Sequence, residues 1–293
     1  VFVDVDSKTL NIDLDDLERK ITSKSKAIMI VHVLGNCCDM DRLMDICKRY
    51  NLILIEDNCE SLGTSYKGKY LGTFGEVSTT SHYWSHQLQS IEGGSILTSN
   101  SELIEIIRAL RSHGWTRQLN NREEIEKQYP EIDSRFLFIN MGYNLRPTEI
   151  QGRMATSQLG KLKIKNDNRK INYKKIIEKL KSDSRNDFLS FPEATEGTDA
   201  AWFGVILFVD SSKIKLRTYL EYLTNHSIEN RPIVTGNFAR QPVVRDLFPD
   251  LDPLAFPGAE IIHHTGLFIG LPCSLMSDET IDELVEILLG YKI

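Results

Sequence analysis

The chain has 293 residues, of which 41% are hydrophobic and 26% charged, with a formal net charge of -6 and a pI near 5.7. It can bury the core of one large or two medium domains, and its acidic balance argues against general binding of nucleic acid or of an anionic membrane surface. Its five cysteines include no C-x-x-C pair, and no run of 18 apolar residues or signal peptide is found, so the sequence predicts a cytoplasmic protein without a disulfide framework, zinc site or membrane span.

The first half is predicted to alternate strands and helices. Strands are expected over 1–5, 27–34, 52–55, 77–83 and 95–98. Helices are expected over 13–21, 39–50 and from about 103 to 113. The strands are nearly continuous apolar runs, which is typical of a parallel sheet covered on both faces, and the fold class is therefore α/β. A polar, aperiodic excursion is expected over 115–138.

The second half is predicted to be a smaller α+β domain. A long helix is expected over 148–181, because Pro147 and Glu149 suit its first turn. A strand over 201–209 and helices around 216–223 and 281–288 follow. These elements predict a large domain over 1–147, a connecting helix over 148–181 and a C-terminal domain over 182–293.

The segment 56–94 carries the densest set of chemically useful side chains. Glu56 and Asp57 end a predicted strand, where a carboxylate reaches the ligand crevice of a parallel sheet, although a cap of the following turn is an alternative role. Residues 81–86, Ser-His-Tyr-Trp-Ser-His, then bring two hydroxyls and two imidazoles together. The segment 92–94, Glu-Gly-Gly, leads into the next strand.

This pattern resembles the active-site core of the DegT/DnrJ/EryC1/StrS family, the fold type I sugar aminotransferases that use pyridoxal phosphate (PLP). The family usually has an acidic pair, a Gly-x-Phe-Gly turn, here residues 72–75, and Ser-Phe-Tyr-Pro-Ser-Lys before Glu-Gly-Gly. In this chain His86 replaces the lysine, and an imidazole cannot form the lysine's Schiff base with PLP. The chain is therefore similar to the family's nucleotide-sugar 3-dehydratases, which remove the C3 hydroxyl of a 4-keto-6-deoxyhexose in dideoxysugar and lipopolysaccharide O-antigen biosynthesis.

The resemblance implies roles for five residues around the cofactor. Asp57 would pair with the pyridine nitrogen of PLP or of its amine form, PMP, and Ser81 would bind the phosphate. Glu60 would lie near the cofactor's O3′, where the aminotransferases usually carry Gln or His. His86 would be the acid–base catalyst, and Asn144 would reach the phosphate from a neighbouring subunit.

Four further residues are implied in substrate binding: His113, Arg231, Asn237 and Arg240. Arginine can hold a diphosphate or a carboxylate through two parallel hydrogen bonds. For His113, a cap at a helix C-terminus is the alternative role. The adjacent pair His263-His264 lacks a third ligand at metal spacing, so no metal is expected.

The resemblance also implies partners: a nucleotide-sugar substrate, glutamate as amino donor and a second subunit in a homodimer. We expect the family's N-terminal quarter, with a phosphate loop and a ring-stacking aromatic residue, to lie outside this sequence. An iron–sulfur variant of the reaction is not expected, because Cys273 is the only cysteine of the C-terminal half. Two alternatives stay open: a sugar aminotransferase with an unusual histidine, and a non-catalytic member that acts as a binding protein.

Overall fold

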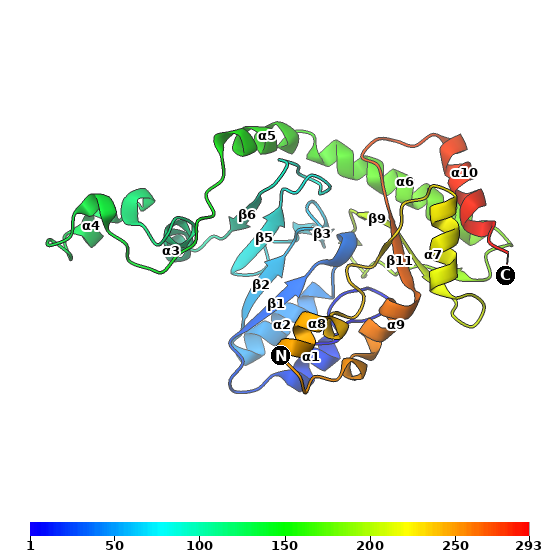
Figure 1. The fold of residues 1–293 in the computed structure, drawn as a ribbon, viewed down its shortest axis with the longest axis horizontal. Coiled ribbons are helices and arrows are strands. Elements are labelled where there is room, and N and C mark those ends of the chain that lie inside the picture. Colours follow the sequence, from blue (N-terminus) through cyan, green and yellow to red (C-terminus); the bar gives the residue numbers. More distant parts are fainter. Residues whose placement is uncertain (293) are drawn as a thin grey trace.

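A computed structural model describes residues 1–292 and places a four-stranded sheet in the first half (Figure 1). Its strands are β1 (Ala27–Val31), β2 (Ile53–Asp57), β5 (Val77–Ser81) and β6 (Gly94–Leu97), in the order β1-β2-β5-β6. The first three are parallel, and β6 is antiparallel to β5. The prediction of an α/β fold with a mainly parallel sheet is confirmed.

Helices α1 (Leu14–Lys20) and α2 (Met40–Tyr50) cover one face of this sheet. Helix α2 begins because the Asp39 carboxylate accepts a hydrogen bond from the Arg42 N–H, and it ends at Asn51 in a left-handed conformation. Their apolar side chains form one core with β1 and β2, made of residues that include Leu14, Leu17, Ile28, Ile30, Met40, Leu43, Ile46 and Leu54. The helix–sheet packing fixes where β1 and β2 end, and therefore where the acidic pair lies.

The strand expected over 1–5 is wrong. Only Val5 makes a single antiparallel bridge, with Ile12. The Asp4 N–H donates to the Asp16 carboxylate at 2.7 Å, and the Asp4 carboxylate accepts hydrogen bonds from the first turn of helix α9 (Pro257–Thr265). The polar groups of this segment are therefore used by side chains and a helix end rather than by a neighbouring strand.

The excursion over 115–138 contains short helices that its polar sequence did not predict. Helix α3 (Ser101–Arg111) leads into η2 (Thr116–Gln118), α4 (Arg122–Glu126) and η3 (Ser134–Phe136). Helices α3 and α4 lie at one end of the molecule's long axis, and α7 (Leu216–Asn225) and α10 (Asp278–Leu289) lie at the other (Figure 1).

The helix expected over 148–181 is two helices, α5 (Glu149–Leu159) and α6 (Leu162–Ser182). Thr148 begins α5 with a capping box, in which its hydroxyl and the Gln151 side chain each accept a backbone N–H. The break falls at Gly160, and glycine is a poor helix former because its backbone loses the most entropy. The domain division at residues 147 and 182 stays a prediction.

The second half is built on an antiparallel sheet, in keeping with an α+β arrangement. Its strands are β7 (Leu189–Ser190), β9 (Gly204–Val209), β10 (Arg231–Pro232) and β11 (Gly266–Gly270), in the order β10-β11-β9-β7. All six residues of β9 are buried, in cores shared with helices α6, α7, α9 and α10.

The remaining elements are η1 (Val33–Gly35), α8 (Pro242–Leu247), α9 (Pro257–Thr265), η4 (Phe238–Arg240) and η5 (Pro253–Ala255). A small sheet joins the halves, since β3 (Ser65–Tyr66) pairs with both β4 (Lys69–Tyr70) and β8 (Thr198–Asp199). No helix within residues 1–292 is both long enough and apolar enough to cross a membrane.

Candidate active site

The candidate site lies where the parallel strands β1, β2 and β5 end. Asp57, the last residue of β2, is in register with Val31 of β1 and Thr79 of β5. Ser81 is the last residue of β5, and His86 follows in the next loop. Because the carboxyl ends of parallel strands share one edge, residues distant in the sequence meet here, at the usual position of a ligand crevice in an α/β protein.

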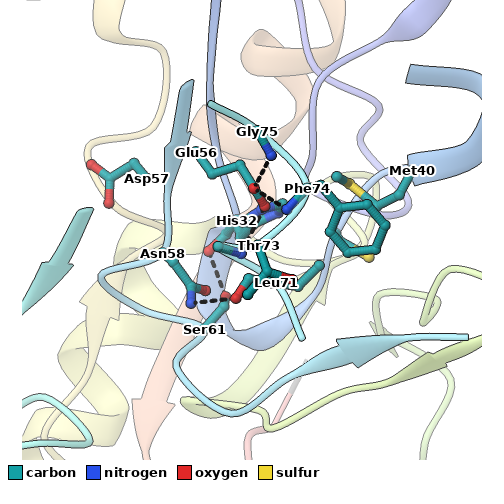
Figure 2. Close-up of polar contacts among 12 residues, drawn as sticks. His32, Met40, Glu56, Asp57, Asn58, Ser61, Leu71, Thr73, Phe74 and Gly75 are labelled. Carbon is teal, nitrogen blue, oxygen red and sulfur yellow. Dashed lines mark hydrogen bonds and ion pairs between the residues drawn. The ribbon is translucent and has the colours of Figure 1, made fainter. Parts of the chain in front are cut away.

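Glu56 is the fully buried member of the acidic pair, and it holds the Gly-x-Phe-Gly turn in place (Figure 2). One carboxylate oxygen accepts hydrogen bonds from the Phe74 and Gly75 N–H groups, at 2.7 and 2.6 Å. The other accepts from the Gly72 N–H at 2.7 Å and lies 3.0 Å from Nε2 of the buried His32. Burial opposes the charge, but His32 and the backbone donors outweigh it and lower the pKa of Glu56.

Asp57 is the partly exposed member, and its carboxylate lies on the opposite side of β2 from Glu56 (Figure 2). This alternation is the ordinary geometry of a strand. One Asp57 oxygen accepts the Cys59 N–H at 3.0 Å, which orients the carboxylate and leaves the second oxygen available to a ligand. The sequence could not tell which of the two acids is structural.

His86 is held by the loop that follows β2. Its Nδ1 lies 2.8 Å from the Cys59 carbonyl oxygen, which can only accept a hydrogen bond. The proton of the neutral ring is therefore on Nδ1, and Nε2 is the basic nitrogen. Burial lowers the pKa of His86, and the Arg169 cation lowers it further. The Cys59 carbonyl and the Asp57 carboxylate favour the charged ring, but burial outweighs them. The ring is thus a neutral base at neutral pH.

Glu60 and Ser81 complete the predicted cofactor set in this subunit. A Glu60 carboxylate oxygen accepts the Leu34 N–H at 3.0 Å. Burial is the main cause that raises the pKa of Glu60, and Asp57 adds to it against the opposing Leu34 hydrogen bond. The Ser81 hydroxyl accepts the Tyr83 N–H at 3.2 Å and keeps its own proton to donate.

Two residues of this site were missed by sequence reasoning because they come from the second half. The Phe203 ring, just before β9, lies 5.4 Å from the His86 ring between centroids. Arg169 of α6 lies over Phe203 and is buried. From the sequence alone, one buried arginine in a Lys-rich helix cannot be distinguished from its solvent-exposed neighbours.

His113 and Asn144 lie on either side of the excursion over 115–138, where the chain before it pairs with the chain after it. Asn144 pairs with Ser112 in an antiparallel bridge, and the His113 N–H donates to the Tyr143 carbonyl at 2.7 Å. Both side chains are exposed. Among residues 1–292, no hydrogen bond joins either of them to Asp57 or His86.

Asn237 and Arg240 meet at Glu260, a residue that sequence reasoning did not single out. Arg240 makes two hydrogen bonds to the Glu260 carboxylate, at 2.6 and 2.5 Å, and the buried Asn237 amide donates to it at 2.7 Å. The Arg240 guanidinium lowers the pKa of Glu260 to about 2. Arg231 is exposed on β10 and pairs with Glu229. Within residues 1–292, no three His, Cys, Asp or Glu side chains are arranged to hold a metal ion.

The site has an acid at the end of one parallel strand, a hydroxyl at the end of the next and a basic residue in the following loop. This arrangement is that of the aminotransferase-like class of PLP-dependent folds. Residues 1–289 match the DegT/DnrJ/EryC1/StrS aminotransferase family, and the chain belongs to this family.

Its relatives include GDP-4-keto-6-deoxy-D-mannose 3-dehydratase of Yersinia pseudotuberculosis, at 38% identity over 272 residues, which cover 92% of this chain and 68% of the relative. The solved Escherichia coli GDP-4-keto-6-deoxy-D-mannose-3-dehydratase with bound hydrated PLP superposes with a TM-score of 0.88 at 35% identity, over 98% of this chain and 73% of that one. A GDP-4-keto-6-deoxymannose-3-dehydratase with a trapped PLP-glutamate geminal diamine matches equally well, with a TM-score of 0.88, 35% identity and coverage of 98% and 74%.

Proposed function

We propose that the protein is a PLP/PMP-dependent 3-dehydratase, which removes the C3 hydroxyl of a nucleotide-linked 4-keto-6-deoxyhexose and uses glutamate as amino donor. One observation carries the proposal: His86 stands in the family's lysine position with Nδ1–H held by the Cys59 carbonyl and Nε2 free. A relative named as a 3-dehydratase and a solved 3-dehydratase with a PLP-glutamate adduct support it.

The residues at the strand ends fit the chemical groups of PLP. The Asp57 oxygen that is not bonded to Cys59 can accept a hydrogen bond from the pyridinium N–H, and the Ser81 hydroxyl can donate to a phosphate oxygen. Glu60 holds the position that faces the ring oxygen O3′ in the family, and burial raises the pKa of its carboxyl. When bound, PLP supplies an aldehyde carbon that takes up an amine and a ring that withdraws electrons.

His86 then performs the proton transfer. Its Nε2 would accept the proton released beside the electron-withdrawing ring and would pass it to the C3 hydroxyl of the sugar, which would then leave as water. The Cys59 carbonyl stabilises the imidazolium that forms, because Nδ1–H keeps its hydrogen-bond acceptor throughout. A lysine at this position would form a covalent link to PLP, which His86 cannot, and so the histidine favours dehydration over transamination.

The test is product analysis. The protein is incubated with PLP, glutamate and a panel of GDP- and CDP-4-keto-6-deoxyhexoses, and the sugar products are identified by mass spectrometry. We expect a sugar that has lost its C3 oxygen without gaining nitrogen, together with ammonia. An aminosugar would establish the aminotransferase instead, and no PLP absorbance would favour the non-catalytic protein.

His86→Asn is the matched variant for this assay, with His226→Asn as its control. We expect His86→Asn to lower the rate of dehydration by about 10²–10⁴-fold, since general acid–base catalysis contributes on that scale. His226 is exposed at the end of α7 and bonds only the Tyr222 carbonyl, so its replacement should leave the rate unchanged. Equal rates for both variants would refute the role of His86.

We also propose that the protein is a homodimer in which Asn144 completes the partner's site. Large apolar side chains are exposed around Asn144 and on α5 and β6: Ile96, Leu97, Phe138, Met141, Tyr143, Leu145 and Ile150. Such a patch on a water-soluble surface is typical of an interface. The exposed Asn144 amide would then bind the phosphate of the neighbouring subunit.

Mixing experiments test this arrangement. His86→Asn and Asn144→Ala chains are each expected to be inactive, but their heterodimer has one site with both residues intact, so the co-refolded mixture should regain activity. Met141→Asp with Leu145→Asp should yield monomers in analytical ultracentrifugation. Leu247→Asp on α8 is the control, because Leu247 is as exposed but lies outside the patch. A mixture that stays inactive would contradict the shared site.

A further inference from the structure

Among residues 1–292, the His86 imidazole makes one hydrogen bond, and this bond leaves its ring plane unfixed. The Nδ1 contact with the Cys59 carbonyl defines one direction, about which the ring can still tilt. Two aromatic rings restrain this tilt by edge-to-face contacts with the imidazole: Tyr83 of the same loop, 5.9 Å between centroids and at 89°, and Phe203 of the second half, 5.4 Å and at 72°. The backbone of Phe203 is itself fixed, since its N–H donates to the Leu34 carbonyl at 3.0 Å.

Arg169 covers the same Phe203 ring from helix α6. Its guanidinium carbon is 5.3 Å from the Phe203 centroid, within the range of a cation–π contact. Arg169 is only 4% exposed. Its Nε donates to the Leu271 carbonyl at a long 3.4 Å, and within residues 1–292 its buried Nη1 has no hydrogen-bond partner. A buried charge with so few hydrogen bonds destabilises the fold. Its presence at this position therefore points to a role other than stability.

We propose that Arg169 is a positioning residue for His86, acting through Phe203. The guanidinium fixes the Phe203 ring, and the ring edge in turn keeps the imidazole in the plane that directs Nε2 at the reacting carbon. Neither residue touches the reacting atoms. This inference rests on the proposed role of His86 as the base.

The charge of Arg169 has a second consequence for His86. The chargeable groups around the imidazole are Asp57 at the end of β2, Cys59 and Glu60 in the loop that follows, Tyr83 in the loop of His86 itself, and Arg169 of α6. Burial raises the pKa of the Cys59 thiol to about 12, so Cys59 stays neutral. Arg169 is the cation of this set, and it disfavours the imidazolium.

The test compares Arg169→Gln, Arg169→Lys and Phe203→Leu by ¹⁵N NMR of histidine-labelled protein, without cofactor. In the unchanged protein the ¹⁵N shifts should show the proton on Nδ1 of His86. Both Arg169→Gln and Phe203→Leu should shift the signals toward a mixture of tautomers. Arg169→Gln should also raise the His86 pKa, whereas Phe203→Leu and Arg169→Lys, which keep the cation, should raise it less.

Lys163→Gln is the control, because it removes one positive charge from the exposed face of α6. It should change neither the tautomer nor the rate. In steady-state assays, Arg169→Gln and Phe203→Leu should lower kcat tenfold or more with little change in KM, and Arg169→Lys should restore part of kcat.

Unchanged ¹⁵N spectra in folded Arg169→Gln and Phe203→Leu proteins would overturn the proposal, as would an effect on KM alone. If Arg169→Gln does not fold, as circular dichroism would show, Phe203→Leu and Arg169→Lys decide. Failure of the proposed function gives a different result: the tautomer shift would remain, but His86→Asn would keep full activity.

Discussion

Replacement of Glu56 tests the idea that the first acid of the pair is structural. Its two oxygens satisfy three backbone N–H groups and His32, all at 2.6 to 3.0 Å, in a fully buried position. Glu56→Ala leaves these donors without an acceptor. Each buried donor that is left without an acceptor costs about 1–3 kcal/mol, so we expect the free energy of unfolding to fall by at least about 3 kcal/mol.

Glu56→Gln separates charge from shape. The amide keeps one acceptor oxygen, but its NH₂ group must face either the Phe74 and Gly75 N–H groups or that of Gly72. At least one buried donor is then unsatisfied, which costs about 1–3 kcal/mol. We therefore expect a smaller loss than for Glu56→Ala.

Urea unfolding followed by circular dichroism measures both losses. Glu178→Ala is the control, because Glu178 is an exposed acid on α6 and its variant should unfold like the unchanged protein. The pKa of Glu56 is lowered in the folded state, so its stabilisation is complete above the unfolded value of about 4.3 and is lost as the pH falls through the folded value. A Glu56→Ala protein as stable as Glu178→Ala, or a difference that grows on acidification, would refute this account.

Two further predictions concern catalysis and the junction between the halves. Because burial lowers the pKa of His86, kcat/KM should be flat across neutral pH and should fall on the acid side with an apparent pKa below about 6.5. A fall with an apparent pKa above that value would show that another residue is the base. Gly35→Ala should destabilise the protein by about 1–3 kcal/mol more than Gly68→Ala, measured by urea unfolding. Both glycines have positive φ, but a Cβ at Gly35 would lie 2.4 Å from the Ala201 carbonyl oxygen, and one at Gly68 would meet no atom within 4 Å. Equal losses would show that backbone strain alone decides.

The sequence by itself determined the fold class and the chemistry of the first half. The strand–helix alternation up to β5 follows from local apolar periodicity, and it fails at residues 1–5, where side chains take the backbone hydrogen bonds. Asp57, Ser81 and His86 could be found because they lie in one continuous segment whose spacing matches a family pattern. The break of the long helix at Gly160 is a local effect that a weak propensity only hints at.

The tertiary structure alone decided how these residues work. The packing of β2 assigned Glu56 to the interior and Asp57 to the open side, and the loop after β2 brought the Cys59 carbonyl to His86, which sets its tautomer. Phe203 and Arg169 reach the site only because the second half folds back onto the first, and such long-range contacts depend on the packing of the whole chain rather than on any local pattern.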